Sequence, residues 1–124
     1  MKTTFGIIAL MAVVLVAGCA SNAPATGNGG ATGAKTVNVA ITDSGFEPEV
    51  LAINSGDTVV WTSSKDGGTW PASDDHPAHT KLPGFDALKG LSRGQTYQFT
   101  FTKTGTWGYH DHLHPTVVGT IIVK

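Results

Sequence analysis

Residues 105–115 read GTWGYHDHLHP, and this stretch gives the strongest single indication of both fold and function. It follows a turn glycine and is rich in aromatic residues, which is typical of a β-strand. Successive side chains of a strand point to opposite faces, so Tyr109 and Asp111 share one face while His110 and His112 share the other. With the aromatic face turned inward, the two imidazoles lie outside, where they can chelate one ion.

Six short segments are predicted to be strands, because apolar and polar residues alternate in them or because β-branched and aromatic residues dominate. They are residues 36–41, 50–53, 58–62, 96–101, 106–110 and 117–123. No helical period follows residue 19, so the pattern predicts an all-β sandwich or barrel. Phe46-Glu47-Pro48 is interpreted as a turn, and residues 63–95 as a long connection that carries function or small elements of its own.

The first 34 residues are predicted to be a targeting signal followed by a flexible linker. The apolar run after the basic start is too short for a comfortable membrane span, as in a signal peptide. It ends in Val16-Ala17-Gly18-Cys19, which resembles the bacterial lipobox, so Cys19 is the expected lipidation site. An ordinary secretory signal is the alternative. We expect a signal peptide at 1–18, the lipidated Cys and a flexible linker at 19–34, and the folded domain at 35–124.

Composition narrows the function classes. The 124 residues carry a net charge of −1, and the sequence has no cluster of Lys or Arg that could bind the phosphate backbone of a nucleic acid. A nucleic-acid binder is therefore not expected. Neither a Walker-type phosphate loop nor a Gly-x-Ser-x-Gly nucleophile motif occurs, and we do not expect an enzyme. The chain contains a single Cys, which excludes an internal disulfide and a Cys-rich zinc site.

All five histidines lie between residues 76 and 114, in two tight clusters. Neutral imidazole is a common ligand of copper and zinc, and clustering makes a shared metal site the favoured interpretation over separate solvated side chains. Copper is the expected ion and zinc the alternative. The candidate ligands, in descending order of expectation, are His110, His112, His79, His76 and His114.

Several motifs, in this order and spacing, resemble those of the cupredoxin family over residues 36–124. The motifs are Phe46-x-Pro48, Leu51, Gly56-Asp57-Thr58-Val59-x-Trp61, Phe85-Asp86, Gly94, Gly105 to His110, His114-Pro115 and Gly119-x-Ile121. The resemblance implies a Greek-key β-sandwich with a copper site at one end, where the loop after the third strand meets the loop between the last two.

The sequence departs from the copper ligands that this resemblance implies. A type 1 site uses two His, a Cys and a weak axial Met. The position of the first His holds Thr69, that of the Cys holds Asp111 and that of the Met holds Val117; only His114 matches. A blue copper centre is therefore not expected. The His-x-His pair instead resembles segments of multicopper oxidases, in which such ligands face copper ions shared between domains, so a metal shared across a homo-oligomer interface is one possibility.

Two kinds of residue keep more than one interpretation. Asp111 can fix an imidazole tautomer from outside the metal's ligand set, bind the metal itself or form a strand-end turn. Core or rim packing is favoured for Trp70 and Trp107, although either ring could shield a site from water or interact with a soft ion. A solvated acidic loop is favoured for Asp74 and Asp75, although either carboxylate could orient an imidazole.

The favoured function is copper binding by an extracytoplasmic or periplasmic lipoprotein, for sequestration or delivery. The membrane would be reached through Cys19, and a copper-handling or redox protein is the expected partner. Electron transfer is the first alternative. A small copper redox enzyme and a metal-free structural lipoprotein are the others.

Overall fold

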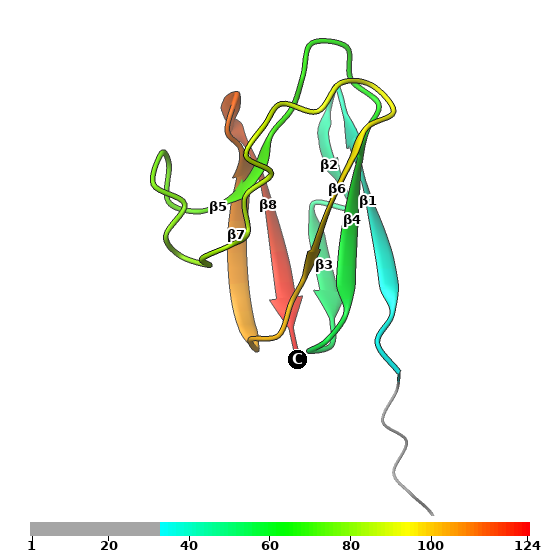
Figure 1. Ribbon diagram of the computed structural model, residues 1–124, viewed down its shortest axis with the longest axis vertical. Helices are drawn as coiled ribbons and strands as arrows, with labels where there is room; N and C mark the ends of the chain where they lie inside the picture. Colours follow the sequence, from blue (N-terminus) through cyan, green and yellow to red (C-terminus); the bar gives the residue numbers. More distant parts are fainter. Residues whose placement is uncertain (1–32) are drawn as a thin grey trace, which may run out of the picture. The chain divides into compact units, whose positions relative to one another are not determined.

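The computed structural model describes residues 33–124, which form a sandwich of two four-stranded β-sheets (Figure 1). The expected signal peptide, Cys19 and most of the linker lie outside the described residues. No helix occurs in residues 33–124, and accordingly none there is long and apolar enough to cross a membrane. The prediction of an all-β sandwich is confirmed.

Each sheet combines one parallel pair of strands with two antiparallel pairs. The first sheet has the order β2 (Gly45–Glu47), β1 (Thr36–Thr42), β4 (Thr58–Ser63) and β6 (Thr96–Thr100). The second has the order β3 (Val50–Ile53), β8 (His114–Val123), β7 (Gly105–Asp111) and β5 (Pro71–Ser73). The six predicted strands are all present, with ends that shift by a few residues.

Two strands were not predicted. Phe46 and Glu47, interpreted together with Pro48 as a turn, belong instead to β2, which pairs with β1 because the turn that precedes it brings Phe46 opposite Ile41. Within the long connection, Pro71–Ser73 forms β5 at the edge of the second sheet. Three residues are too few for an alternating pattern to show in the sequence. β5 matters for function, because it pairs with the histidine-bearing end of β7.

Aromatic rings fill the space between the sheets. Trp61 is fully buried and lies within 5.0–6.3 Å, centroid to centroid, of four other rings. Those rings belong to Phe85, Tyr97, Phe101 and Tyr109. Tyr109 presses so closely on β8 that a side chain at Gly119 would overlap its ring. Burial raises the pKa of the Tyr109 hydroxyl, so this residue is a neutral core residue.

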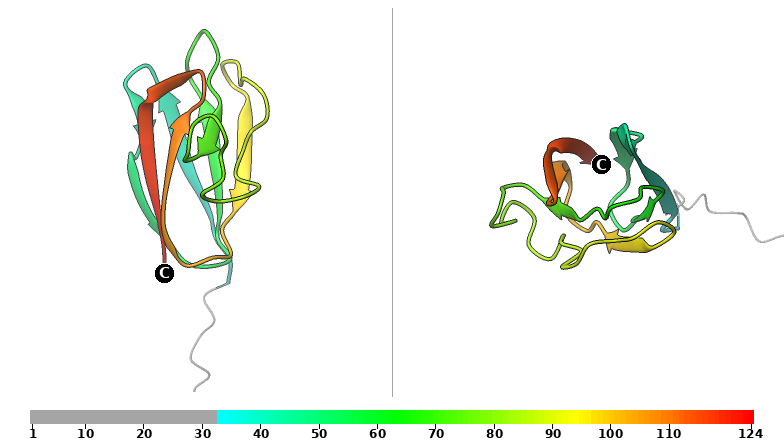
Figure 2. Two further views of the ribbon diagram at one scale, coloured as in Figure 1. Left: turned by 90° about the vertical axis from the view of Figure 1, so that its left-hand side faces the viewer. Right: turned by 90° about the horizontal axis from the view of Figure 1, so that it is seen from above.

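The segment between β5 and β6 runs along the side of the sandwich where these two strands form the edges of the sheets, as the two views of Figure 2 show. Backbone hydrogen bonds tie it down: Ser73 N donates to Phe85 O at 2.8 Å, and Asp74 N donates to Gly108 O at 3.0 Å. Leu82 and Phe85 anchor it further, since both side chains are buried in the core cluster. The segment between β5 and β6 is therefore fixed against β5 and β7.

Candidate metal centre

β7 delivers two histidines to the outer face of the second sheet. Tyr109 and Asp111 are completely buried on the inner side, as the alternation predicted. His110 points outward, yet it is only 2 % exposed because the segment after β5 covers it. His112 follows the strand, and its backbone N donates to Trp70 O at 2.7 Å, which fixes it beside β5.

The segment that follows β5 brings two further histidines over the same face. His79 has a positive φ of 53°, and its backbone N donates to Asp75 O at 2.6 Å, so the chain turns tightly here. Ser73 Oγ donates to His79 O at 3.0 Å, which ties the turn back to β5. His76 is exposed at the outer edge, whereas His79 is partly buried.

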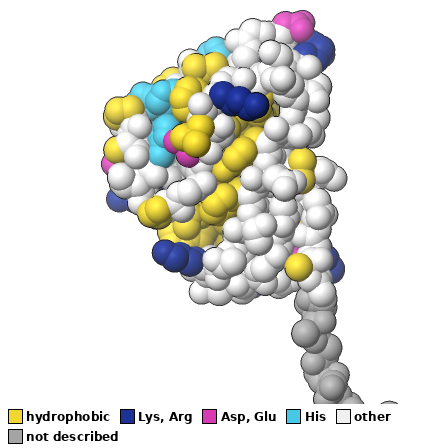
Figure 3. Space-filling view, in the orientation of Figure 1, with side chains coloured by type: hydrophobic (Ala, Val, Ile, Leu, Met, Phe, Trp, Pro, Cys, Tyr) yellow, Lys and Arg dark blue, Asp and Glu magenta, His cyan; other side chains and the backbone are white. Residues whose placement is uncertain are grey.

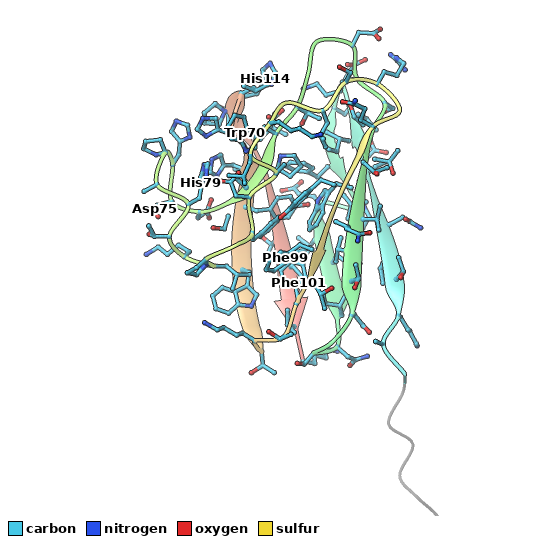
Figure 4. The ribbon with its side chains drawn as sticks, viewed as in Figure 1. Trp70, Asp75, His79, Phe99, Phe101 and His114 are labelled. Atoms are coloured by element: carbon cyan, nitrogen blue, oxygen red, sulfur yellow. The ribbon has the colours of Figure 1, made fainter. Side chains whose placement is uncertain are left out.

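Four imidazoles meet at this place. One ring nitrogen from each lies within 4.8 Å of the others, and the group comprises His76, His79, His110 and His112. His76 Nδ1 lies 3.2 Å from His110 Nε2, and His79 Nε2 lies 2.9 Å from His112 Nδ1. We call this group the histidine cluster. Figure 3 shows the imidazoles gathered on one side of the molecule, and Figure 4 shows His79 in the segment beside β5 and β7.

The donor set and its spacing fit a single first-row metal ion. Nitrogens that lie about 2.0–2.1 Å from a metal are roughly 2.9 Å apart at right angles and roughly 3.4 Å apart in a tetrahedron. The two short nitrogen–nitrogen distances, 2.9 and 3.2 Å, fall in that range. A trans pair would be roughly 4.1 Å apart, so even the widest separation in the cluster needs to close by less than about 1 Å.

Two carboxylates hold imidazoles of the cluster from behind. Asp86 Oδ2 lies 2.7 Å from His79 Nδ1, and Asp74 Oδ1 lies 3.3 Å from His110 Nδ1. Burial opposes ionisation of Asp86, but hydrogen bonds from Trp70, Leu88 and His79 outweigh it and lower its pKa below the usual value. An ionised carboxylate on Nδ1 places that ring's proton there and leaves Nε2 free to bind a metal.

Trp70 also contacts the cluster, from the residue before β5. Its ring lies 4.5 Å from that of His112, centroid to centroid, and its Nε1 donates to Asp86 Oδ1 at 2.6 Å. The expected packing role at the rim therefore includes direct contact with one candidate ligand and with the carboxylate behind another.

A second polar group lies behind β7, on the inner side of the same strand end. It is centred on Asp111, which is completely buried. Asp111 accepts hydrogen bonds from Thr69 Oγ1 at 2.9 Å and from Trp70 N at 2.8 Å, and it lies 2.9 Å from His114 Nδ1. Lys65 Nζ lies 3.6 Å from the same carboxylate. We call these residues the Asp111 network.

The Asp111 network carries fixed charge. Burial disfavours the charged form of Asp111, but its hydrogen bonds, with Trp70 N first, outweigh burial and keep its pKa below the usual value. The Lys65 side chain is only 12 % exposed, so its ammonium group pairs with this carboxylate largely out of contact with water.

The family resemblance implies copper ligands at four positions, and three of these come together in the Asp111 network. They are Thr69, Asp111 and His114.

The structure thus divides the predicted histidines. It brings four of the five together, while His114 lies apart from them, near the upper end of the sandwich in Figure 4, with its ring against Asp111. Asp75 is exposed and bonded to Thr80, which lowers its pKa to about 2, as a solvated loop residue would be. Asp74 differs from that expectation, because it reaches His110.

Two contributing residues were missed. The sequence marks Asp86 only as part of a family motif, and it does not mark Lys65. No local pattern in the sequence marks either one, because their partners lie 7 and 46 positions away and are brought close by the fold.

Comparison with known proteins assigns the fold to a family. The model of the family described as "Cupredoxin-like domain" matches residues 6–123. Amicyanin from Paracoccus denitrificans is 34 % identical over 83 residues, which span 64 % of this chain and 58 % of the relative. The match thus covers under two thirds of that relative's length.

Solved structures agree with this assignment. The purple cupredoxin of Nitrosopumilus maritimus superposes with a TM-score of 0.61 at 25 % identity, covering 71 % of this chain and 99 % of the other. The copper-containing nitrite reductase of Thermus scotoductus superposes with a TM-score of 0.62 at 28 % identity, covering 72 % of this chain and 22 % of the other. The chain belongs to the cupredoxin-like domain family.

Proposed function

We propose that this protein binds one Cu(II) ion through the histidine cluster and serves to sequester or deliver copper outside the cytoplasm. The observation that carries the proposal is the convergence of four imidazole nitrogens within 4.8 Å of one another. Solvent-exposed histidines on a loop would not by themselves indicate a metal site. Here one ligand is buried, two are partly buried, and carboxylates orient two of the rings.

Copper is preferred over zinc by the chemistry of the donors. Among divalent first-row ions, a nitrogen site binds Cu(II) most tightly, with zinc behind it. Similarity to solved structures of a copper-containing nitrite reductase and of amicyanin in a Cu(I) form supports the same choice. The four ligands come from one chain, so the proposal needs no second copy to complete the site.

Electron transfer is the second candidate, because the chain resembles amicyanin and the purple cupredoxin. It is less well supported by the residues. The thiolate that tunes a blue copper site is replaced by Asp111, which is engaged with Thr69, His114 and Lys65. The resemblance to a nitrite reductase covers 22 % of that protein's chain, so we do not extend its activity to this one.

Location and anchoring complete the proposal. The amicyanin relationship and the apolar N-terminal run support a periplasmic or other extracytoplasmic site. Anchoring through Cys19 rests on the lipobox resemblance alone. Replacing this residue, Cys19→Ser, is expected to abolish lipid labelling and to release the protein from the membrane fraction; unchanged labelling would remove the anchor from the proposal.

The binding proposal is tested by titrating the metal-free domain, residues 35–124, with Cu(II) against a competing chelator. We expect one ion per chain. The double variant His110→Ala/His112→Ala removes two ligands and is expected to weaken binding at least a hundredfold, about 2.7 kcal/mol. His114→Ala is the matched control, and it should bind copper within about twofold of wild type. Equal affinities in all three proteins would contradict the assignment.

A further inference from the structure

The four imidazoles of the cluster are of two kinds. His79 and His110 each have Nδ1 against a carboxylate and Nε2 turned toward another imidazole. His76 and His112 offer Nδ1 to the centre. A copper ion here would therefore have two ligands that carry a negative charge directly behind them and two that lack this hydrogen bond in residues 33–124.

Hydrogen bonds fix the position of the Asp86 carboxylate behind His79. It is 20 % exposed and receives hydrogen bonds from Trp70 Nε1 at 2.6 Å and Leu88 N at 2.8 Å, beside the contact with His79. Because the Trp70 ring packs on His112, the same carboxylate also fixes the surroundings of a second ligand. The Asp86 carboxylate cannot rotate away from the site without breaking these hydrogen bonds.

Asp74 reaches the cluster through a gap that the sequence leaves open. Its carboxylate lies over Gly108 of β7, where a Cβ atom would overlap Asp74 Oδ2. Its side chain is 48 % exposed, so its contact with His110 is weaker than that of Asp86 with His79. Gly108 therefore permits a second negative charge beside the cluster, and a larger residue there would displace it.

We propose that Asp86 and Asp74 are positioning residues that make the histidine cluster selective for Cu(II) over Cu(I). The inference rests on the proposed function and specifies which oxidation state the site retains. Two fixed negative charges stabilise a doubly charged ion more than a singly charged one, and a partly buried setting strengthens the difference. Each charge acts through an imidazole whose basicity it raises. The site accordingly stores copper in its oxidised form.

The test measures both oxidation states in a series of variants. Cu(II) and Cu(I) affinities are determined by chelator competition, and the reduction potential of the bound copper is measured independently. Asp74→Asn keeps an oxygen acceptor for His110 and removes only the charge. Asp86→Asn removes the charge behind His79, and Gly108→Ala pushes Asp74 aside without changing any charged residue. Asp66→Asn, whose carboxylate pairs with Arg93 on the surface, is the matched charge control.

Second-layer partners of metal ligands contribute about 10–100-fold to metal affinity. We expect Asp86→Asn to lower the ratio of Cu(II) to Cu(I) affinity by at least about tenfold, equivalent to a rise of about 59 mV for a one-electron couple. Asp74→Asn and Gly108→Ala should act in the same direction with smaller effects. Asp66→Asn should leave the ratio unchanged.

Equal losses of Cu(II) and Cu(I) affinity would show that the carboxylates only maintain structure, and an unchanged ratio would show that they do nothing for selectivity; either result overturns the inference while copper binding stands. Absence of copper binding by the wild-type protein would overturn the proposed function and this inference together. Thermal unfolding of each metal-free variant identifies a folding defect, and the half-exposed Asp74 provides a variant that should fold normally.

Discussion

The histidine cluster and the Asp111 network lie on opposite sides of one strand end, and neighbouring residues in the chain belong to different ones. His110 and His112 face the outer cluster, while Asp111 between them faces the inner network. The inner side is where the family resemblance implies copper. There, the positive charge comes from the protein itself, because Lys65 forms an ion pair with Asp111.

If copper binds at the histidine cluster, as we propose, the metal site lies on the other side of this strand end while the strands of the fold stay the same. On the inner side, hydrogen bonds already satisfy the carboxylate, so a cation would have to displace Lys65 and several donors. On the outer side, ring nitrogens face one another, and the ion pairs that Lys and Arg form within residues 33–124, Lys65–Asp111 and Arg93–Asp66, lie outside the cluster. We therefore expect the first region to stabilise the fold, and we propose that the second binds an ion.

The largest expected effect comes from breaking the inner network. Asp111→Ala leaves Lys65, Thr69 and the Trp70 N–H group without their buried acceptor, so we expect the metal-free protein to lose about 3 kcal/mol of unfolding free energy. Chemical denaturation measures this loss. Asp66→Ala, on the exposed surface, should unfold at nearly the wild-type denaturant concentration. Equal midpoints for the two variants would mean that the network does not hold the strand end.

Copper itself should stabilise the protein by a similar amount, through the outer region alone. Free Cu(II) at 100 times the dissociation constant contributes about 2.7 kcal/mol, which for a domain of this size raises Tm by roughly 10–20 °C. Calorimetry with and without a chelator measures the shift. The His110→Ala/His112→Ala protein should lose most of it, and an equal shift in that variant would place the ion elsewhere.

A substitution with a smaller expected effect on stability tests whether the two regions act independently. Lys65→Met keeps the aliphatic stem and removes the charge beside Asp111, so we expect a loss of about 1 kcal/mol in unfolding free energy. Copper affinity should stay within about twofold of wild type, since Lys65 is not part of the histidine cluster. A tenfold change in affinity would show that the two regions are coupled through β7.

Some of this arrangement followed from the sequence because it depends on local periodicity. The alternation around residues 105–115 predicted that Tyr109 and Asp111 face inward and His110 outward. In the structure Tyr109 and Asp111 are completely buried, while His110 contacts His76 and Asp74 of the segment after β5. The sandwich topology that the family resemblance implies also predicted that the two histidine-rich segments meet at one end. The ligand role of these residues, and of His114, stays a prediction.

The rest depends on contacts between distant residues. β2 and β5 are too short to show a period, and their strand form comes from pairing with β1 and β7. The roles of Asp86 and Lys65 arise only when the segment after β5 packs beside the sheet and when the segment between β4 and β5 brings Lys65 to the end of β7. Gly108 illustrates the same limit, because its lack of a side chain makes room for a carboxylate 34 positions earlier in the chain.

The central claim is that copper is bound by imidazoles on the outer face and not at the inner position. Electron paramagnetic resonance and visible absorption of the Cu(II)-loaded domain, residues 35–124, test it most directly, since this part of the chain contains no Cys. We expect a pale protein with weak d–d absorption, the wide parallel hyperfine splitting of a tetragonal nitrogen site and loss of this signal in His110→Ala/His112→Ala. An intense band near roughly 600 nm with compressed splitting, or an unchanged signal in that double variant, would contradict the account.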